Sequence, residues 1–140
     1  MVSPTRNIRL RGAEPTGNGW YGANRSGGRK HRGLDIVAIP GEAILSPIKG
    51  KVVRSGTVYT FTKKFKLLVI SNDTYEVKLM YLDPHPFNPG DMVMEGQEIG
   101  KNQDVSRYWG GGMINHIHME VKKNGLLTDP EPLLVKPDWL

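Results

Sequence analysis

The segment Asn115–Val121, with the sequence NHIHMEV, carries two histidines and a glutamate at alternate positions. Successive side chains of an extended strand point to opposite faces, so His116, His118 and Glu120 share one face of the predicted strand. The hydrophobic residues between them face the core. Two residues of strand span about 7 Å, which is close enough for both imidazoles to serve one reactive centre.

A second pair of candidate ligands lies upstream, where His31 and Asp35 flank the start of a hydrophobic run. This pattern indicates a loop that enters a strand. The chain has no cysteine, so a metal would be held by His, Asp, Glu or main-chain groups. Catalytic zinc of this kind has three protein ligands and keeps a fourth position for water. His31, Asp35 and one strand histidine would supply the ligands, and the other histidine would handle a proton beside the water.

The composition favours short strands as the elements that position these residues. Seventeen glycines and ten prolines in 140 residues predict many strands joined by turns, and no helix. The hydrophobic patterns predict strands over residues 34–38, 43–47, 50–56, 66–71, 74–82 and 116–121, and a short strand near 96–100.

Turn residues and proline content predict how these strands are connected. Asn72-Asp73 and Asn124-Gly125 indicate hairpin turns. Alternation along 74–82 places Tyr75, Val77, Leu79 and Tyr81 on one face. Residues 83–90, with three prolines, and 101–113 are predicted to be loops.

Length and charge limit the classes of function. A chain of 140 residues is the usual size of one domain. The net charge of +5 suits an anionic partner, but no nucleic-acid-binding motif accompanies it, so nucleic acid is a disfavoured partner. No long apolar run is present, which predicts a soluble protein without a signal peptide or a membrane span. Action on a cell wall would then require lysis, a phage-like particle or another delivery route.

The N-terminal residues allow two interpretations. They form an arm that packs on the domain through Ile8, Leu10, Trp20 and Tyr21, or the segment Gly17–Gly22 is a loop placed beside the site. The glycines of that segment would allow its backbone to approach a ligand closely.

Five segments resemble, in order, the motifs of the lysostaphin-type zinc metallopeptidases, which are peptidoglycan endopeptidases. They are HRGLDIVA from His31, GEAILSPIKGKVV from Gly41, GDMVMEGQEIG from Gly90, NHIHMEV from Asn115, and Asp129-Pro130. The resemblance covers about residues 17–133 and divides the chain into an arm (1–16), a zinc peptidase-like domain (17–133) and a tail (134–140). It implies an all-β, mainly antiparallel fold of the duplicated-hybrid-motif type, sandwich-like or barrel-like.

The resemblance also assigns roles to the candidate residues. It implies that His31, Asp35 and His118 bind one Zn²⁺, and that His116 is a catalytic histidine in a peptidase that acts on bacterial peptidoglycan. Active members carry a further histidine in a Tyr-x-His-Leu context, where this chain has Tyr81. Leukocyte cell-derived chemotaxin, a similar protein regarded as inactive, has a tyrosine in a similar strand.

Tyr81 therefore leaves two hypotheses open. A phenol with a pKa near 10 is a poor base but a good hydrogen-bond donor to an oxyanion, so Tyr81 is predicted to be catalytic as a donor, in a zinc peptidase of reduced rate. His85 is a candidate substitute for the missing histidine. Alternatively, the chain is an inactive zinc-containing module that recognises a peptide, glycan or protein. The oligomeric state is left open.

Overall fold

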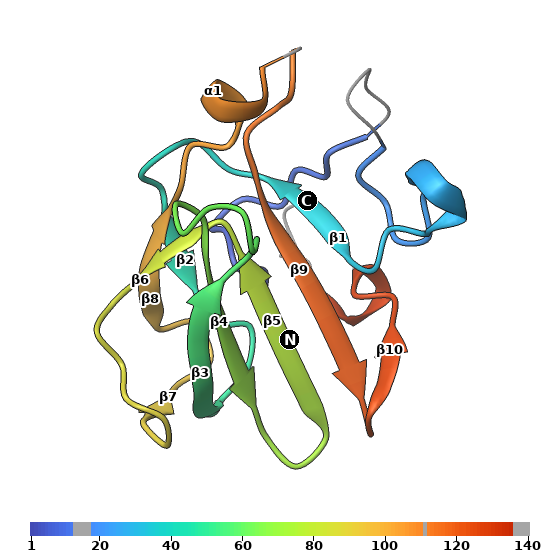
Figure 1. The fold of residues 1–140 in the computed structure, drawn as a ribbon. Coiled ribbons are helices and arrows are strands. Elements are labelled where there is room, and N and C mark those ends of the chain that lie inside the picture. Colours follow the sequence, from blue (N-terminus) through green and yellow to red (C-terminus); the bar gives the residue numbers. More distant parts are fainter. Residues whose placement is uncertain (13–17, 111, 136–140) are drawn as a thin grey trace.

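The computed structural model describes residues 1–12, 18–110 and 112–135. In this part of the chain the strands form two antiparallel sheets (Figure 1). The larger has the order β1 (Leu34–Val37), β9 (His116–Lys123), β5 (Tyr75–Met80), β4 (Lys66–Ser71), β3 (Gly50–Thr57) and β7 (Met92–Val93). A further strand, β10 (Leu126–Thr128), pairs with the C-terminal part of β9, whereas β1 pairs with its N-terminal part. The smaller has the order β2 (Ala43–Leu45), β8 (Glu98–Asn102) and β6 (Leu82–Pro84). The predicted all-β, mainly antiparallel class is confirmed.

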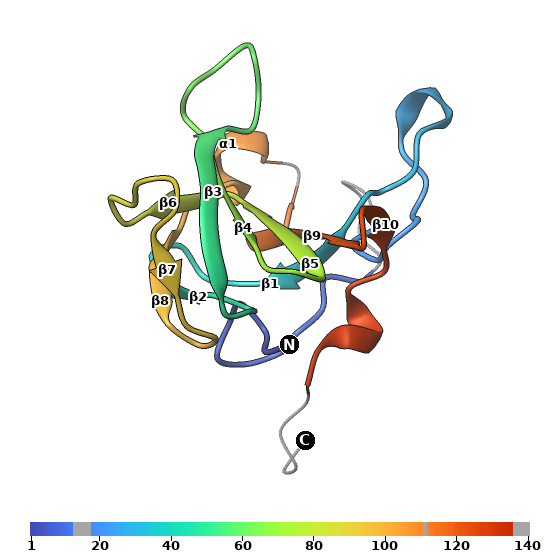
Figure 2. The ribbon, with the colours of Figure 1, turned by 90° about the horizontal axis from the view of Figure 1, so that it is seen from below.

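Hydrophobic side chains from both sheets form one core. Figure 2 shows the backbones of the two sheets from below, with β2, β6 and β8 to one side of the larger sheet. The core includes Ile44, Leu82 and Ile99 of the smaller sheet together with the inward-facing residues of β1, β4, β5 and β9. Both predicted hairpins are present: β4 and β5 flank Asn72-Asp73, and β9 and β10 flank Asn124-Gly125. Asn124 and Gly125 have φ angles of 50° and 81°, the left-handed pair that a tight two-residue turn needs.

The position of β9 between β1 and β5 organises the site. Asp35 of β1 and Met80 of β5 both pair with His118 of β9, so these three residues lie on one face of the sheet. Their neighbours Leu34, Leu79 and Met119 pair in the same way and point into the core. The predicted alternation along residues 116–121 is therefore confirmed, with a chemical face and a core face.

The expectation of no helix is wrong for three single turns. The described residues include α1 (Ser106–Trp109) and two 3₁₀ turns, η1 (Ser26–Gly28) and η2 (Glu131–Leu133). Each is too short to give the 3.6-residue hydrophobic period on which a helix prediction depends. None of the helices in the described residues is long and apolar enough to cross a bilayer.

The strand predicted over residues 74–82 is interrupted at Tyr81, whose φ of 75° lies in the left-handed region. Strand alternation predicted Tyr81 on the same face as Leu79, and this is wrong, because Leu79 points into the core and Tyr81 lines the same pocket as Met80. Hydrogen bonds hold the turned backbone: Tyr81 N–H donates to Lys66 O (2.9 Å), and Tyr81 O accepts from Gln103 N–H (2.8 Å). They offset a left-handed conformation that costs about 1–2 kcal/mol for a residue other than glycine.

The N-terminal segment packs on β1 mainly through its main chain. Leu10 forms an antiparallel bridge with Ile36, and Arg11 N–H donates to Asp35 O at 3.0 Å. The side chains of Leu10 and Trp20 stay 36% and 45% exposed, so the predicted packing through them is a minor part of the contact. The predicted boundary between arm and domain at residues 16–17, and the end of the tail at 136–140, lie outside the described residues.

Candidate functional site

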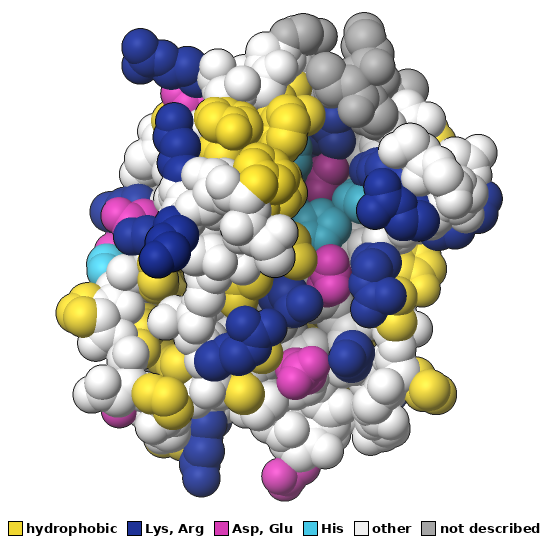
Figure 3. Space-filling view, viewed as in Figure 1, with side chains coloured by type: hydrophobic (Ala, Val, Ile, Leu, Met, Phe, Trp, Pro, Cys, Tyr) yellow, Lys and Arg dark blue, Asp and Glu magenta, His cyan; other side chains and the backbone are white. Residues whose placement is uncertain are grey.

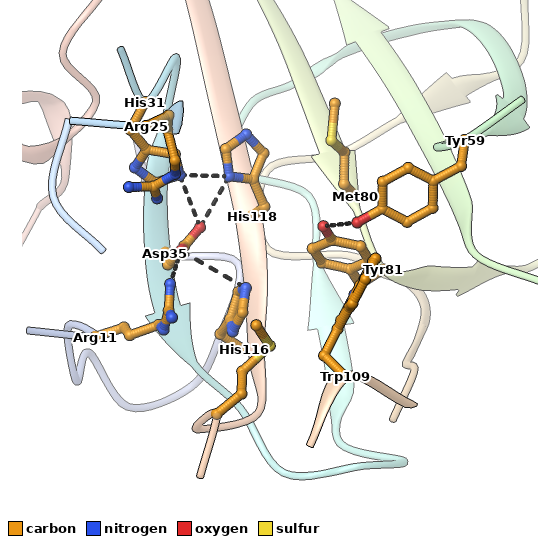
Figure 4. Close-up of a pocket in the computed structure, with 11 residues that line it drawn as sticks. Arg11, Arg25, His31, Asp35, Tyr59, Met80, Tyr81, Trp109, His116 and His118 are labelled. Carbon is orange, nitrogen blue, oxygen red and sulfur yellow. Dashed lines mark hydrogen bonds and ion pairs between the residues drawn. The ribbon is translucent and has the colours of Figure 1, made fainter. Parts of the chain in front are cut away.

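Three buried side chains from two strands and a loop converge on one point (Figure 4). His31 precedes β1, Asp35 lies on β1, and His118 lies on β9. Nε2 of His31 is 3.2 Å from Oδ1 of Asp35 and 3.0 Å from Nδ1 of His118. Nδ1 of His118 is 2.8 Å from the same oxygen of Asp35. The structure thus brings together the three residues that the sequence suggested as metal ligands.

The spacing of these donor atoms fits zinc. A tetrahedral zinc ion with bonds of about 2.0–2.1 Å holds its ligand atoms about 3.3 Å apart. The three separations of 2.8 to 3.2 Å are close to this value. Two imidazole nitrogens and one carboxylate oxygen are also a donor set that suits zinc. The group can therefore hold one such ion with little rearrangement.

Hydrogen bonds on the far side of each imidazole orient the two histidines. Nδ1 of His31 lies 2.9 Å from Trp20 O, which can only accept, so the proton of His31 is on Nδ1. Nε2 of His118 lies 2.9 Å from Oε2 of Glu120 and donates to it in the same way. His31 thus turns a lone pair toward the point of convergence, and His118 would do the same once a metal ion replaced the proton between its Nδ1 and Asp35. Residues 18–22 of the segment predicted to lie beside the site do so, because the carbonyl of Trp20 bonds to His31, and Gly17 lies outside the described residues.

Two features of these contacts were not predicted from the sequence. Glu120 was placed on the chemical face but given no role, although its position two residues after His118 brings it into reach. Arg11 was missed: its Nη1 donates to Oδ2 of Asp35 at 2.7 Å, and both side chains are about 3% exposed. No local pattern links Arg11 to the site, because it reaches Asp35 through long-range packing.

Hydrogen bonds between the acidic and histidine side chains of the site shift their pKa values. Burial alone would lower the pKa of His118, but its hydrogen bonds with Asp35 and Glu120 outweigh burial and raise the pKa to about 9. Burial would raise the pKa of Asp35, but bonds with His118 and His31 hold this pKa well below its usual value. Asp35 is therefore ionised, with Oδ1 facing the histidines and Oδ2 facing Arg11.

His116 lies beside this group. Its Nδ1 donates to Ile114 O at 2.8 Å, which leaves the lone pair on Nε2, 3.6 Å from Oδ2 of Asp35. Burial lowers the pKa of His116, more than the nearby Asp35 raises it. The imidazole is therefore mainly neutral at pH 7 and can accept a proton at Nε2.

Tyr81 stands next to His116 and is bonded to a second tyrosine. The rings of Tyr81 and His116 meet edge to face at 5.6 Å, and the hydroxyl groups of Tyr81 and Tyr59 are 2.7 Å apart. Burial, and then the bond to Tyr59, raise the pKa of Tyr81 far above its usual value of 10. Tyr81 thus stays protonated and can serve as a donor but not as a base. Tyr59 lies between β3 and β4 in a segment with no sequence signal.

His85 has no place in this site. Its Nε2 is 2.9 Å from Oε2 of Glu98, and its side chain is 41% exposed. It lies in the loop after β6, away from the residues that line the pocket. The suggestion that His85 replaces the missing histidine is therefore not supported by its position.

The converging side chains form the floor of an open groove with two unlike walls (Figures 3 and 4). Lys and Arg side chains gather on one side of the hollow and hydrophobic ones on the other, with His and acidic side chains between them. The groove is lined by Arg11, Arg25, His31, Asp35, Tyr59, Met80, Tyr81, Trp109, Met113, His116 and His118.

Gly33 gives a test of how tightly the backbone fits around His118. A Cβ atom at Gly33 would lie 2.3 Å from Met119 O and 2.9 Å from Nε2 of His118. We expect Gly33→Ala to lower the free energy of unfolding by about 1–3 kcal/mol and to weaken zinc binding, because a main-chain atom would have to move. Urea denaturation and zinc titration would measure both. Gly12→Ala is the control, since a Cβ there has no neighbour within 4 Å; equal behaviour of the two variants would contradict the prediction.

The sequence profile of Peptidase family M23 matches residues 29–130. Myeloid protein 1 of Gallus gallus is 32% identical over 123 residues, which are 84% of this chain but only 36% of that protein. The chain thus spans little more than a third of this relative.

Two solved structures show the same fold. The catalytic domain of the antimicrobial peptidase lysostaphin from Staphylococcus simulans is 25% identical, with a TM-score of 0.60 over 84% of this chain and 87% of that one. A zinc-containing peptidase from Vibrio cholerae is 21% identical, with a TM-score of 0.59 over 86% of this chain and 39% of that one.

Proposed function

The chain belongs to peptidase family M23, and from this premise we propose that it is a zinc-dependent endopeptidase that cleaves the peptides of bacterial peptidoglycan. The observation that carries the proposal is the close triangle of His31, Asp35 and His118 with the neutral His116 beside it. The open groove above these residues gives a peptide access to them. The net charge of +5 favours contact with an anionic cell wall.

Each residue of the site has a task in this proposal. Zinc held by His31, Asp35 and His118 would lower the pKa of a water molecule and polarise the scissile carbonyl. His116 would take the proton of the attacking water at Nε2, since the bond to Ile114 O fixes the proton of the ring on Nδ1. Tyr81 would donate its hydroxyl hydrogen to the oxygen on which negative charge develops.

The test is incubation of the zinc-loaded protein with purified peptidoglycan from several bacteria. We expect new amino termini to be released by the zinc-loaded protein and not by protein treated with a chelator. The absence of release from every peptidoglycan, with zinc bound, would overturn the endopeptidase proposal.

One observation favours a second candidate function, a zinc-containing binding module without peptidase activity. Tyr81 occupies the place of a histidine found in active lysostaphin-type enzymes, and its raised pKa prevents it from acting as a base. Peptidoglycan that is retained by the zinc-loaded protein but not cleaved would support the module.

Removal of the Tyr81 hydroxyl is a further test that distinguishes the endopeptidase from the binding module. If Tyr81 stabilises an oxyanion, Tyr81→Phe lowers the rate of hydrolysis on the order of 10²-fold, the cost of one lost donor, and leaves the zinc content unchanged. Tyr75→Phe, on the same hairpin but outside the groove, is the control and should keep the full rate. A Tyr81→Phe variant that is as fast as the wild type would show that the hydroxyl is not used.

A further inference from the structure

Arg25 presents a positive charge on one wall of the groove. Its side chain is half-buried, and its Nη2 and Nη1 donate to the main-chain carbonyls of Asn18 (2.8 Å) and Asn24 (3.2 Å). These two bonds fix the orientation of the guanidinium group and engage two of its five N–H donors. Arg25 lines the same groove as His31 and Asp35 and is labelled in Figure 4.

Among the described residues, no carboxylate forms an ion pair with Arg25. Asp35 is the acidic side chain that lines the groove, and its Oδ2 already accepts from Arg11 at 2.7 Å. Its Oδ1 faces the two histidines. Glu120, the next carboxylate along the floor, is bonded to His118 and lies 3.8 Å from both Arg32 and Lys78. The charge of Arg25 is therefore available to a bound ligand.

The opposite wall of the groove is aromatic and uncharged. The ring of Tyr59 meets Trp109 edge to face at 5.8 Å and stacks on Phe61 at 4.9 Å. Trp109 is 44% exposed, so its ring offers apolar surface to a ligand in the groove. Such a wall can cover the main chain of an extended peptide but has no positive charge to pair with a carboxylate on it.

We propose that the groove selects peptides that carry a carboxylate next to the scissile amide, with Arg25 as the residue that binds this carboxylate. A guanidinium group matches a carboxylate by two parallel hydrogen bonds, and partial burial strengthens them. An uncharged chain, such as a run of glycines, makes no such pair and leaves Arg25 unused. This inference rests on the proposed function, because it assumes that the ligand of the groove is a peptide.

Binding measured without cleavage tests the selectivity directly. We would use zinc-loaded protein in a His116→Ala background and three C-terminally amidated, fluorescein-labelled peptides, Gly-Glu-Gly-Gly-Gly, its glutamine counterpart and pentaglycine, with fluorescence anisotropy as the readout. The acidic peptide should bind at least about tenfold more tightly than the glutamine peptide, as expected for one charge-assisted bidentate pair. Arg25→Gln should reduce this preference to less than about twofold without a change in zinc content. Arg29→Gln should keep it, since Arg29 lies on the same loop but does not line the groove.

Equal affinity for the acidic and glutamine peptides before any change at Arg25 would overturn the inference, and this comparison does not depend on the folding of a variant. An equal loss of preference in Arg25→Gln and Arg29→Gln would overturn it as well. Tight, Arg25-dependent binding of the acidic peptide without hydrolysis by the wild type would support the selectivity and overturn the endopeptidase. Hydrolysis of glycine chains as fast as of acidic peptides would keep the endopeptidase and overturn the selectivity.

Discussion

Replacement of Asp35 by alanine is expected to abolish zinc binding and to lower the free energy of unfolding by about 3–5 kcal/mol, even in the metal-free protein. The carboxylate of Asp35 contacts both histidines of the triangle and Arg11. Its Oδ1 is bonded to His118 and lies 3.2 Å from His31, and its Oδ2 is bonded to Arg11. Removal of one member of an ion pair whose two side chains are each about 3% exposed leaves the other without that partner.

Metal analysis of the purified variant and urea denaturation in the presence of a chelator measure the two effects separately. Asp83→Ala is the control, because the side chain of Asp83 is 64% exposed and its ion pair with Lys66 (3.2 Å) lies on the surface. Exposed pairs contribute little to stability, so this variant should match the wild type in both measurements. One zinc per chain in Asp35→Ala would show that the triangle is not the metal site.

The sequence was most informative where side-chain spacing is set by one strand. His116 and His118 are on the chemical face of β9 because alternation along a strand is fixed by the backbone, and the pairing of β1 with β9 then places Asp35 opposite His118. His31 lies four residues before Asp35, on the loop that leads into β1. The residue pattern alone indicated His31, Asp35 and one of the two strand histidines as ligands, and the family resemblance assigned His118 to the metal and His116 to catalysis.

Alternation failed where the backbone leaves the strand conformation. The φ of 75° at Tyr81 turns this side chain from the core to the groove, and no rule of spacing predicts a left-handed residue that is not glycine. Arg11, Arg25 and Tyr59 were missed for another reason. They come from segments without hydrophobic periodicity, and only the packing of the whole chain brings them to the groove.

The bounds of strands and loops were likewise predicted well in some segments and poorly in others. The strand over residues 66–71 was predicted with its observed bounds, since a continuous buried run leaves little choice. The predicted loop at 83–90 begins two residues too early, because Asp83 and Pro84 belong to β6 at the edge of the smaller sheet, where proline is tolerated.

Replacement of His116 by alanine is expected to reduce hydrolysis by about 10²- to 10⁴-fold while one zinc per chain is retained. The two effects separate because His116 stands outside the triangle of donor atoms: its Nε2 lies 3.6 Å from Oδ2 of Asp35, on the side away from Oδ1. Its loss removes the neutral imidazole that can accept a proton and leaves His31, Asp35 and His118 in place.

Peptidoglycan hydrolysis and metal content of the same protein sample test this expectation, with His85→Ala as the matched control. His85 is a surface histidine bonded to Glu98, so its removal should leave the rate within about twofold of the wild type, as a side chain outside the reaction does. A His116→Ala variant that keeps the wild-type rate would mean that another group handles the proton. Tyr81 cannot do so, because its raised pKa keeps the phenol protonated. Full activity without His116 would therefore contradict the proton-transfer role that we assign to this residue.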